Sequence, residues 1–269
     1  MSRIWDCLYS DLVPFAAVAI ATLSLTIRRT AWRVPGERGA TLAVLLLGLG
    51  AYLVSDATPI GDWLYPYTGA GYVDTFLGNL CWIGGLVALL HHVFHRLAEH
   101  DERVEIFDAL LRWPITLVVP LMLAAMYSSH PLALAPVPDI GDAPADLPLV
   151  VYRALYYGLL AYLCGLLLRA LLIVRREGTR ECRRAATVYM VSAATILGGL
   201  CTRVLSYVHG LGWMHAISPV TRCCAVIGVA AAAAGSWDVK RRKLNATPCA
   251  EDASVSRIEC DGRPDSMRS

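Results

Sequence analysis

Three arginines lie inside long apolar stretches of the second half of the chain, where a charged side chain needs a physical reason. They are Arg153, Arg203 and Arg222. A charge at the centre of a bilayer costs about 3 kcal/mol on insertion scales. Counted at about 1.5 Å per helical residue, the three lie roughly 6 to 11 Å below the nearest end of their stretches. Because a guanidinium group matches a carboxylate or phosphate with two parallel hydrogen bonds, these residues predict a pocket for a small anion.

Two carboxylates at neighbouring positions offer the arginines a different role. Asp56 ends the second apolar stretch and Asp74 opens the third. If each acid pairs with one arginine, the charges tie the helices together and need no ligand. Two acids cannot neutralise three cations, so one arginine is left for an anion. Both interpretations stay open, and four tyrosines at similar depth are placed to line the same cavity: Tyr52, Tyr156, Tyr157 and Tyr207.

A second group of polar side chains lies at the far end of the third stretch. His91, His95 and Glu99 recur every four residues and share one helix face, a spacing that a metal could use. The apolar stretches hold no second group of His, Cys or Glu to complete a coordination shell. The pattern therefore favours a polar helix end over a metal site, and we expect neither a metal nor a cofactor.

No catalytic motif accompanies these residues. The chain lacks a Gly-x-Ser-x-Gly elbow, a His-Glu-x-x-His motif, a Walker loop and a kinase signature. A retinal protein needs a lysine in its last span, and the first lysine here is Lys240. We therefore expect a protein that is not an enzyme and has no nucleic-acid partner.

The composition predicts the elements that must position these residues. With 56% hydrophobic residues, 17% charged residues and a mean hydropathy of +0.50, the chain is typical of a membrane protein rather than a soluble domain. A helix needs roughly 20 mostly apolar residues to cross the hydrocarbon core. We expect an all-α bundle of seven transmembrane helices within residues 1–237, with an uncleaved first helix. The spans are predicted at about 12–27, 39–56, 75–94, 113–130, 149–173, 185–208 and 215–237.

The positive charges predict the orientation of the bundle. Loops 57–74 and 131–148 contain no lysine or arginine. Basic residues gather instead in the alternate connections, which by the positive-inside rule are cytoplasmic. Those connections are 28–38, 95–112, 169–184 and the segment that starts at Lys240. The N-terminus is then outside, the C-terminus is in the cytoplasm, and the arginine pocket faces outward.

Two further features concern the organisation of the chain. Residues 48–55 and 199–206 share a pattern of Gly, Leu, Val and Ser at one constant offset, which allows a weak 3+1+3 repeat or a chance similarity of apolar helices. Residues 238–269 are short and mixed in charge, so we expect a disordered cytoplasmic tail.

Three segments carry a resemblance to a known group of proteins. They are the span from Arg33 to Asp56, the sequence Leu80-Cys81-Trp82-Ile83-Gly84-Gly85, and Val151-Tyr152-Arg153 leading a long span into Arg175-Arg176. In this pattern the chain resembles a family of uncharacterised actinobacterial seven-helix integral membrane proteins that are labelled as transporters. The resemblance covers most of residues 10–237 and implies a bacterial plasma-membrane protein with several spans.

These observations predict a transporter or ligand sensor for a small anion, with Arg153, Arg203, Arg222, Asp56 and Asp74 at the pocket. The bilayer and a small anionic ligand are its expected partners. The alternative is a membrane interaction or immunity subunit that acts on a cytoplasmic protein through the inner loops and tail.

Overall fold

The computed structural model describes residues 2–55, 60–68, 72–134, 140, 143–209 and 213–246. Within these residues the regular structure is entirely helical. Five helical segments are long and apolar enough to cross a membrane: Val73–Leu97, His100–Ser128, Leu147–Glu177, Arg180–Tyr207 and Ile217–Asn245. The prediction of an all-α membrane bundle is confirmed at this level.

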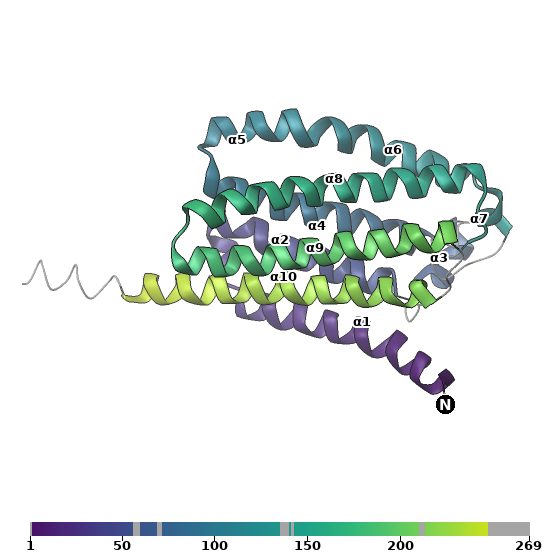
Figure 1. The fold of residues 1–269 in the computed structure, drawn as a ribbon, viewed down its shortest axis with the longest axis horizontal. Helices are drawn as coiled ribbons and strands as arrows, with labels where there is room; N and C mark the ends of the chain where they lie inside the picture. Colours follow the sequence, from purple (N-terminus) through teal and green to yellow (C-terminus); the bar gives the residue numbers. More distant parts are fainter. Residues whose placement is uncertain are drawn as a thin grey trace, which may run out of the picture.

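The long helices run side by side in one bundle (Figure 1). They are α1 (Ser2–Ile27), α2 (Pro35–Leu53), α4 (Val73–Leu97), α8 (Leu147–Glu177), α9 (Arg180–His209) and α10 (Trp213–Ala246). A further rod consists of α5 (His100–Phe107), the π-helical turn η2 (Asp108–Arg112) and α6 (Trp113–Ser128). Short helices occupy the connections: η1 (Ala31–Arg33), α3 (Ile60–Thr68) and α7 (His130–Leu134). Each predicted span overlaps one long helix, but α2 and the apolar part of α1, Leu12–Ile27, are shorter than the five candidate spans, so the number of seven spans stays a prediction.

Two boundaries differ from the sequence-based expectation. Helix α10 continues past residue 237 to Ala246, so the first part of the predicted tail is helical, and residues 247–269 lie outside the described part. Helix α4 extends beyond the predicted span end at residue 94 and ends at Leu97, where Ala98 is extended and Glu99 is the N-terminal cap residue of α5. The proposed 3+1+3 repeat stays a prediction.

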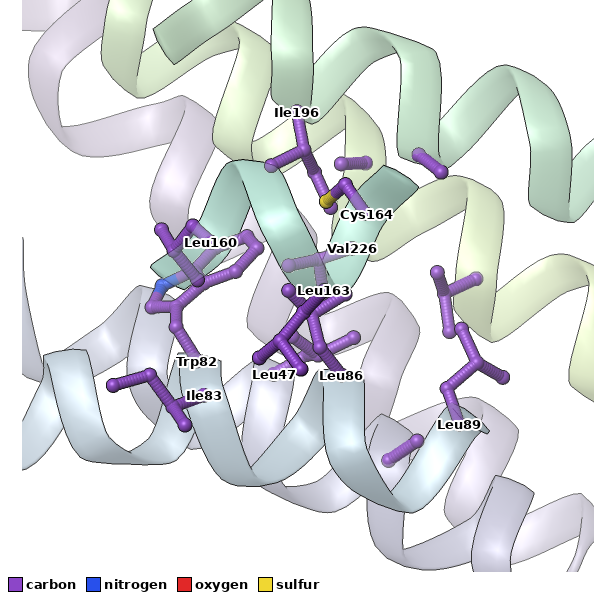
Figure 2. Close-up of a cluster of buried hydrophobic side chains, with 14 of the residues drawn as sticks. Leu47, Trp82, Ile83, Leu86, Leu89, Leu160, Leu163, Cys164, Ile196 and Val226 are labelled. Atoms are coloured by element: carbon purple, nitrogen blue, oxygen red, sulfur yellow. The ribbon is translucent and has the colours of Figure 1, made fainter. Parts of the chain in front are cut away.

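The core lies where five helices meet (Figure 2). Leu47 of α2, Leu86 of α4 and Leu163 of α8 have no exposed surface, and they meet Ile196 of α9 and Val226 of α10. The α2–α4 crossing is especially close because glycines face each other there. A Cβ atom at Gly85 would lie 2.7 Å from Leu47 Cγ, and one at Gly50 would lie 3.0 Å from the Gly78 carbonyl oxygen. Small residues thus let these two backbones approach, as in other membrane helix pairs.

The π-helical turn η2 is held by a side chain from the neighbouring helix. A π-turn disturbs the regular pattern of backbone hydrogen bonds in a helix. Tyr162 of α8 donates a hydrogen bond of 2.9 Å from its hydroxyl to the Leu110 carbonyl oxygen within η2. This contact fixes the α5–α6 rod, which lies at the edge of the bundle, against α8.

Asp146 connects three helix ends: the C-terminus of α6, the start of α7 and the start of α8. Its carboxylate accepts hydrogen bonds from Leu149 N (2.9 Å) in the first turn of α8, from Ser129 Oγ (3.0 Å) and from His130 N (3.0 Å). Burial raises the pKa of Asp146, but these hydrogen bonds outweigh burial and hold the pKa below its ordinary value.

Asp146→Ala should therefore destabilise the protein by about 1–2 kcal/mol, the usual effect of losing a helix N-cap. A thermal melt of the detergent-purified protein measures the loss, with the exposed Glu105→Ala as the control. Because the folded-state pKa is depressed, the contribution of Asp146 is present above its ordinary pKa and disappears as the pH falls through the lower value. Equal melting of the two variants at pH 7 would contradict this role.

Candidate anion-binding site

Arg153 and Arg203, which are buried, and Arg222, which is half-buried, surround one cavity. Its volume is about 40 Å³, enough for roughly three water molecules at 10–15 Å³ each. Helices α4, α8, α9 and α10 all contribute to its wall. The lining residues in the described part are Asn79, Trp82, Ile140, Tyr152, Arg153, Tyr156, Tyr157, Leu160, Ile196, Gly199, Leu200, Arg203, Ser218 and Arg222.

Arg153 is fixed by backbone carbonyls of the segment that precedes α8. Its side chain is only 8% exposed, and Nη2 donates to the carbonyl oxygens of Ile140 (3.0 Å) and Ala143 (2.6 Å). The guanidinium carbon lies 4.7 Å from the centroid of the Tyr207 ring, a cation–π distance. This arrangement orients Arg153 without neutralising its charge.

Arg203 contacts the same tyrosine, which lies four residues further along α9. It is 4% exposed, its Nε donates to the Tyr207 hydroxyl at 3.1 Å, and its guanidinium carbon lies 5.6 Å from the ring centroid. The Tyr207 ring therefore lies against two guanidinium groups, those of Arg153 and Arg203. Among the described residues that line the cavity there is no carboxylate, and three of them are arginines.

Two buried N–H groups of the cavity wall have no hydrogen-bond acceptor among the described residues. These are Arg153 Nε and the indole Nε1 of Trp82, whose side chain is 1% exposed. A buried donor without an acceptor costs about 1–3 kcal/mol. Asn79 adds polarity to the wall, since its Nδ2 donates to the Tyr152 hydroxyl at 2.8 Å. An anion in the cavity would supply the acceptors that these donors lack.

The structure brings the three predicted arginines together in one cavity wall. Asp74 lies in the first turn of α4, accepts a hydrogen bond from the Thr75 amide at 2.7 Å and is not part of the described cavity wall. Asp56 lies outside the described residues. Pairing of these acids with the arginines stays a prediction. Tyr156 and Tyr157 line the cavity as expected, and Tyr207 contacts both arginines.

Sequence reasoning missed the neutral donors of the site. Asn79 and Trp82 both lie within the third span, and a lone amide in an apolar stretch is a usable signal because membrane helices rarely carry one. The carbonyl groups of Ile140 and Ala143 carry no such signal, since any residue could supply them.

A second group of charged side chains, built around the buried pair Arg28 and Glu37, joins the basic ends of four helices. Arg28, with no exposed surface, donates from Nη2 to Glu37 Oε2 at 3.1 Å, from Nε to Thr41 Oγ1 at 3.2 Å and from Nη1 to the Ala233 carbonyl oxygen. Glu37 Oε1 also pairs with Arg96 (3.4 Å) and Lys240 (3.3 Å). We call these four charged residues, Arg28, Glu37, Arg96 and Lys240, the Glu37 cluster.

The Glu37 carboxylate stays ionised within this cluster. Burial raises its pKa, but the basic side chains around it outweigh that effect and hold the pKa below the ordinary value of 4.5. His92, adjacent to the cluster, contacts the Gly36 carbonyl oxygen through Nδ1 at 2.8 Å. One acid thus links the end of α1 to α2, α4 and α10.

The histidines considered as metal ligands make other contacts. The ring of His91 packs edge-on against Phe107, with ring centroids 6.4 Å apart, and the ring of His95 lies against Gly36 of α2. Within the described ranges no three His, Cys, Asp or Glu side chains are grouped as metal ligands would be.

Helices of membrane-spanning length packed in one bundle indicate a multi-pass membrane protein. Comparisons with protein-family models, with curated proteins and with solved structures gave no match to this chain. The resemblance to the actinobacterial family therefore stays a prediction.

Proposed function

We propose that this chain is a seven-helix plasma-membrane protein that binds a small anion from the outer side, as a transporter or a ligand sensor. The observation that carries the proposal is the convergence of Arg153, Arg203 and Arg222 on one cavity. The unpartnered N–H groups of Arg153 and Trp82 support it, because they are donors without acceptors in the same wall. A carboxylate or phosphate group of a few heavy atoms suits the donor set and the cavity size.

The proposed orientation has the N-terminus outside and the C-terminus in the cytoplasm. Contacts among the basic segments support it: Arg28, Arg96 and Lys240 meet at Glu37, and Lys243 pairs with Glu181 at 2.6 Å. The basic connections thus gather at one end of the bundle. The α3 and α7 end lies opposite (Figure 1). Reporter fusions at residue 269 test the orientation, and an exterior C-terminus would contradict it.

Anion binding should stabilise the purified wild-type protein against heat. A ligand at about 100 times its Kd adds about 2.7 kcal/mol of stability. We expect acetate or phosphate at constant ionic strength to raise the melting temperature of wild type, and Arg203→Gln to abolish that rise. Arg29→Gln, which changes an exposed arginine at the other end, should respond as wild type does.

The outcome separates a binding role from a purely structural one. If Arg203→Gln lowers the melting temperature but keeps the full response to the anion, the arginines serve only to hold the helices together. A response of equal size to chloride, acetate and phosphate in all variants would mean that the anions act on the protein as general salts.

A second candidate function is interaction with a cytoplasmic protein. A hollow of about 740 Å³ between α8 and α9 is lined by exposed arginines, Arg175, Arg176, Arg180, Arg183 and Arg184, and no carboxylate belongs to its described wall. Such a surface suits an acidic partner. Deleting residues 247–269 and, separately, changing Arg176 and Arg183 to Gln would test whether output depends on this face while anion binding persists.

A further inference from the structure

A groove at the basic end of the bundle combines an apolar wall with a charged rim. It has a volume of about 700 Å³ and runs between α9 and α10, with the end of α4 at its margin. Val188, Ala231, Gly235 and Val239 form much of the apolar wall. Arg96, Arg184, Lys240 and Lys243 supply the positive charges. The volume falls in the usual range for sites that hold small molecules.

The apolar wall lies on helices of membrane-spanning length. Both Arg180–Tyr207 and Ile217–Asn245 have the length and hydropathy to cross the hydrocarbon core. The wall is hollow because its residues are small, and a Cβ atom placed on Gly235 would meet nothing within 4 Å. An acyl chain therefore has room along this part of α10.

The rim carries more positive charge than the neighbouring acids neutralise. Lys243 pairs with Glu181, the only carboxylate in the described wall of the groove, and Lys240 and Arg96 share Glu37 beneath it. Arg184 has no carboxylate within 4.0 Å in the described part of the chain. The excess charge stands where the apolar wall ends, which is where the phosphate of a membrane lipid would lie.

We propose that this groove binds one anionic phospholipid of the leaflet at the basic end. One acyl chain follows Val188, Ala231 and Gly235, and the phosphate lies between Arg184 and Lys243. A soluble phosphate would leave the apolar wall uncovered, and an acidic peptide would place charge against it. The inference is independent of the arginine cavity, since the two sites share no residue.

Native mass spectrometry of the full chain in detergent tests the wall. The probes are dioleoyl phosphatidylglycerol, dioleoyl phosphatidylcholine, inorganic phosphate and a short poly-glutamate peptide. We expect wild type to retain phosphatidylglycerol about fivefold better than phosphatidylcholine, the usual effect of one unneutralised cation, here Arg184, at a lipid surface. Gly235→Leu should fill the groove and reduce this retention at least several-fold. Gly165→Leu on α8 is the matched control, because a Cβ atom there also meets open space.

A charge variant tests the rim. Arg184→Gln combined with Lys243→Gln should remove the preference for phosphatidylglycerol, whereas Arg29→Gln combined with Arg241→Gln, an equal loss of charge at exposed sites, should keep it. Equal retention of both lipids by wild type overturns the proposal. So does unchanged retention in Gly235→Leu, or binding of phosphate or the peptide as strong as that of phosphatidylglycerol. A failed anion response at the arginine cavity would leave all these results unaffected.

Discussion

Glu37→Ala is expected to destabilise the protein by about 3–5 kcal/mol, the usual effect of removing one partner from a buried ion pair. Arg28 has no exposed surface and would lose its only charged partner in the described part of the chain. Arg96 and Lys240 would lose the same carboxylate, so three cations would repel one another at the junction of four helices. A thermal melt in detergent should show a drop of roughly 10 °C.

Two further variants separate charge from packing in this prediction. Glu37→Gln keeps the shape of the side chain and removes only its charge. Compared with Glu37→Ala, it should preserve part of the packing energy, but it should lose most of the electrostatic stabilisation. Glu181→Ala breaks the exposed pair with Lys243 and should change the melt very little, because exposed pairs contribute little. If Glu37→Ala melts like Glu181→Ala, the Glu37 cluster does not hold the bundle.

The pH dependence of the Glu37 variants has a defined sign. The folded-state pKa of Glu37 is depressed, so its contribution is complete above its ordinary value of 4.5 and disappears as the pH falls through the lower folded value. The difference in melting temperature between wild type and Glu37→Gln should therefore be constant from pH 5 to 7 and shrink at lower pH. A constant difference down to pH 3 would contradict an ionised Glu37.

The Glu37 cluster also shows where sequence reasoning stopped. The positions of Arg28, Arg96 and Lys240 predict which end of the bundle they occupy, because basic residues collect on one side of a membrane. Their spacing cannot show that Arg28 is fully buried or that one glutamate serves all three, since these contacts join residues up to 203 positions apart. Periodicity describes one helix at a time, whereas an ion pair between helices depends on how they pack.

For the arginine cavity, too, the sequence predicted which residues lie at one level but not which contacts they make. The depth of Arg153, Arg203 and Arg222 within their stretches predicted that they could share a pocket, because residues at equal depth in neighbouring helices lie at one level of the bilayer. The role of Tyr207 as a platform for two guanidinium groups and the unpartnered indole of Trp82 required the packed structure. Asp74 stands at a similar level in the sequence, yet it is not part of the described cavity wall.

Gly39→Leu is expected to disrupt the α2–α4 crossing by about 3 kcal/mol or more, at the upper end of the usual cost of overpacking. A Cβ atom on Gly39 would lie 2.9 Å from the Ala88 carbonyl oxygen and 3.2 Å from the His92 amide nitrogen. Both neighbours are backbone atoms, so they cannot rotate away as a side chain can. The two helices would have to separate, which would also strain the contact of His92 with the Gly36 carbonyl oxygen.

Gly165→Leu makes the same chemical change where a Cβ atom meets open space, so it should fold and melt like wild type. Comparing the two variants by thermal melting and by size-exclusion chromatography removes the general effect of replacing glycine in a helix. Equal behaviour would mean that α2 and α4 do not approach at Gly39. A selective loss in Gly39→Leu would show that the bundle depends on this close approach, at the same crossing that brings Glu37 of α2 against Arg96 of α4.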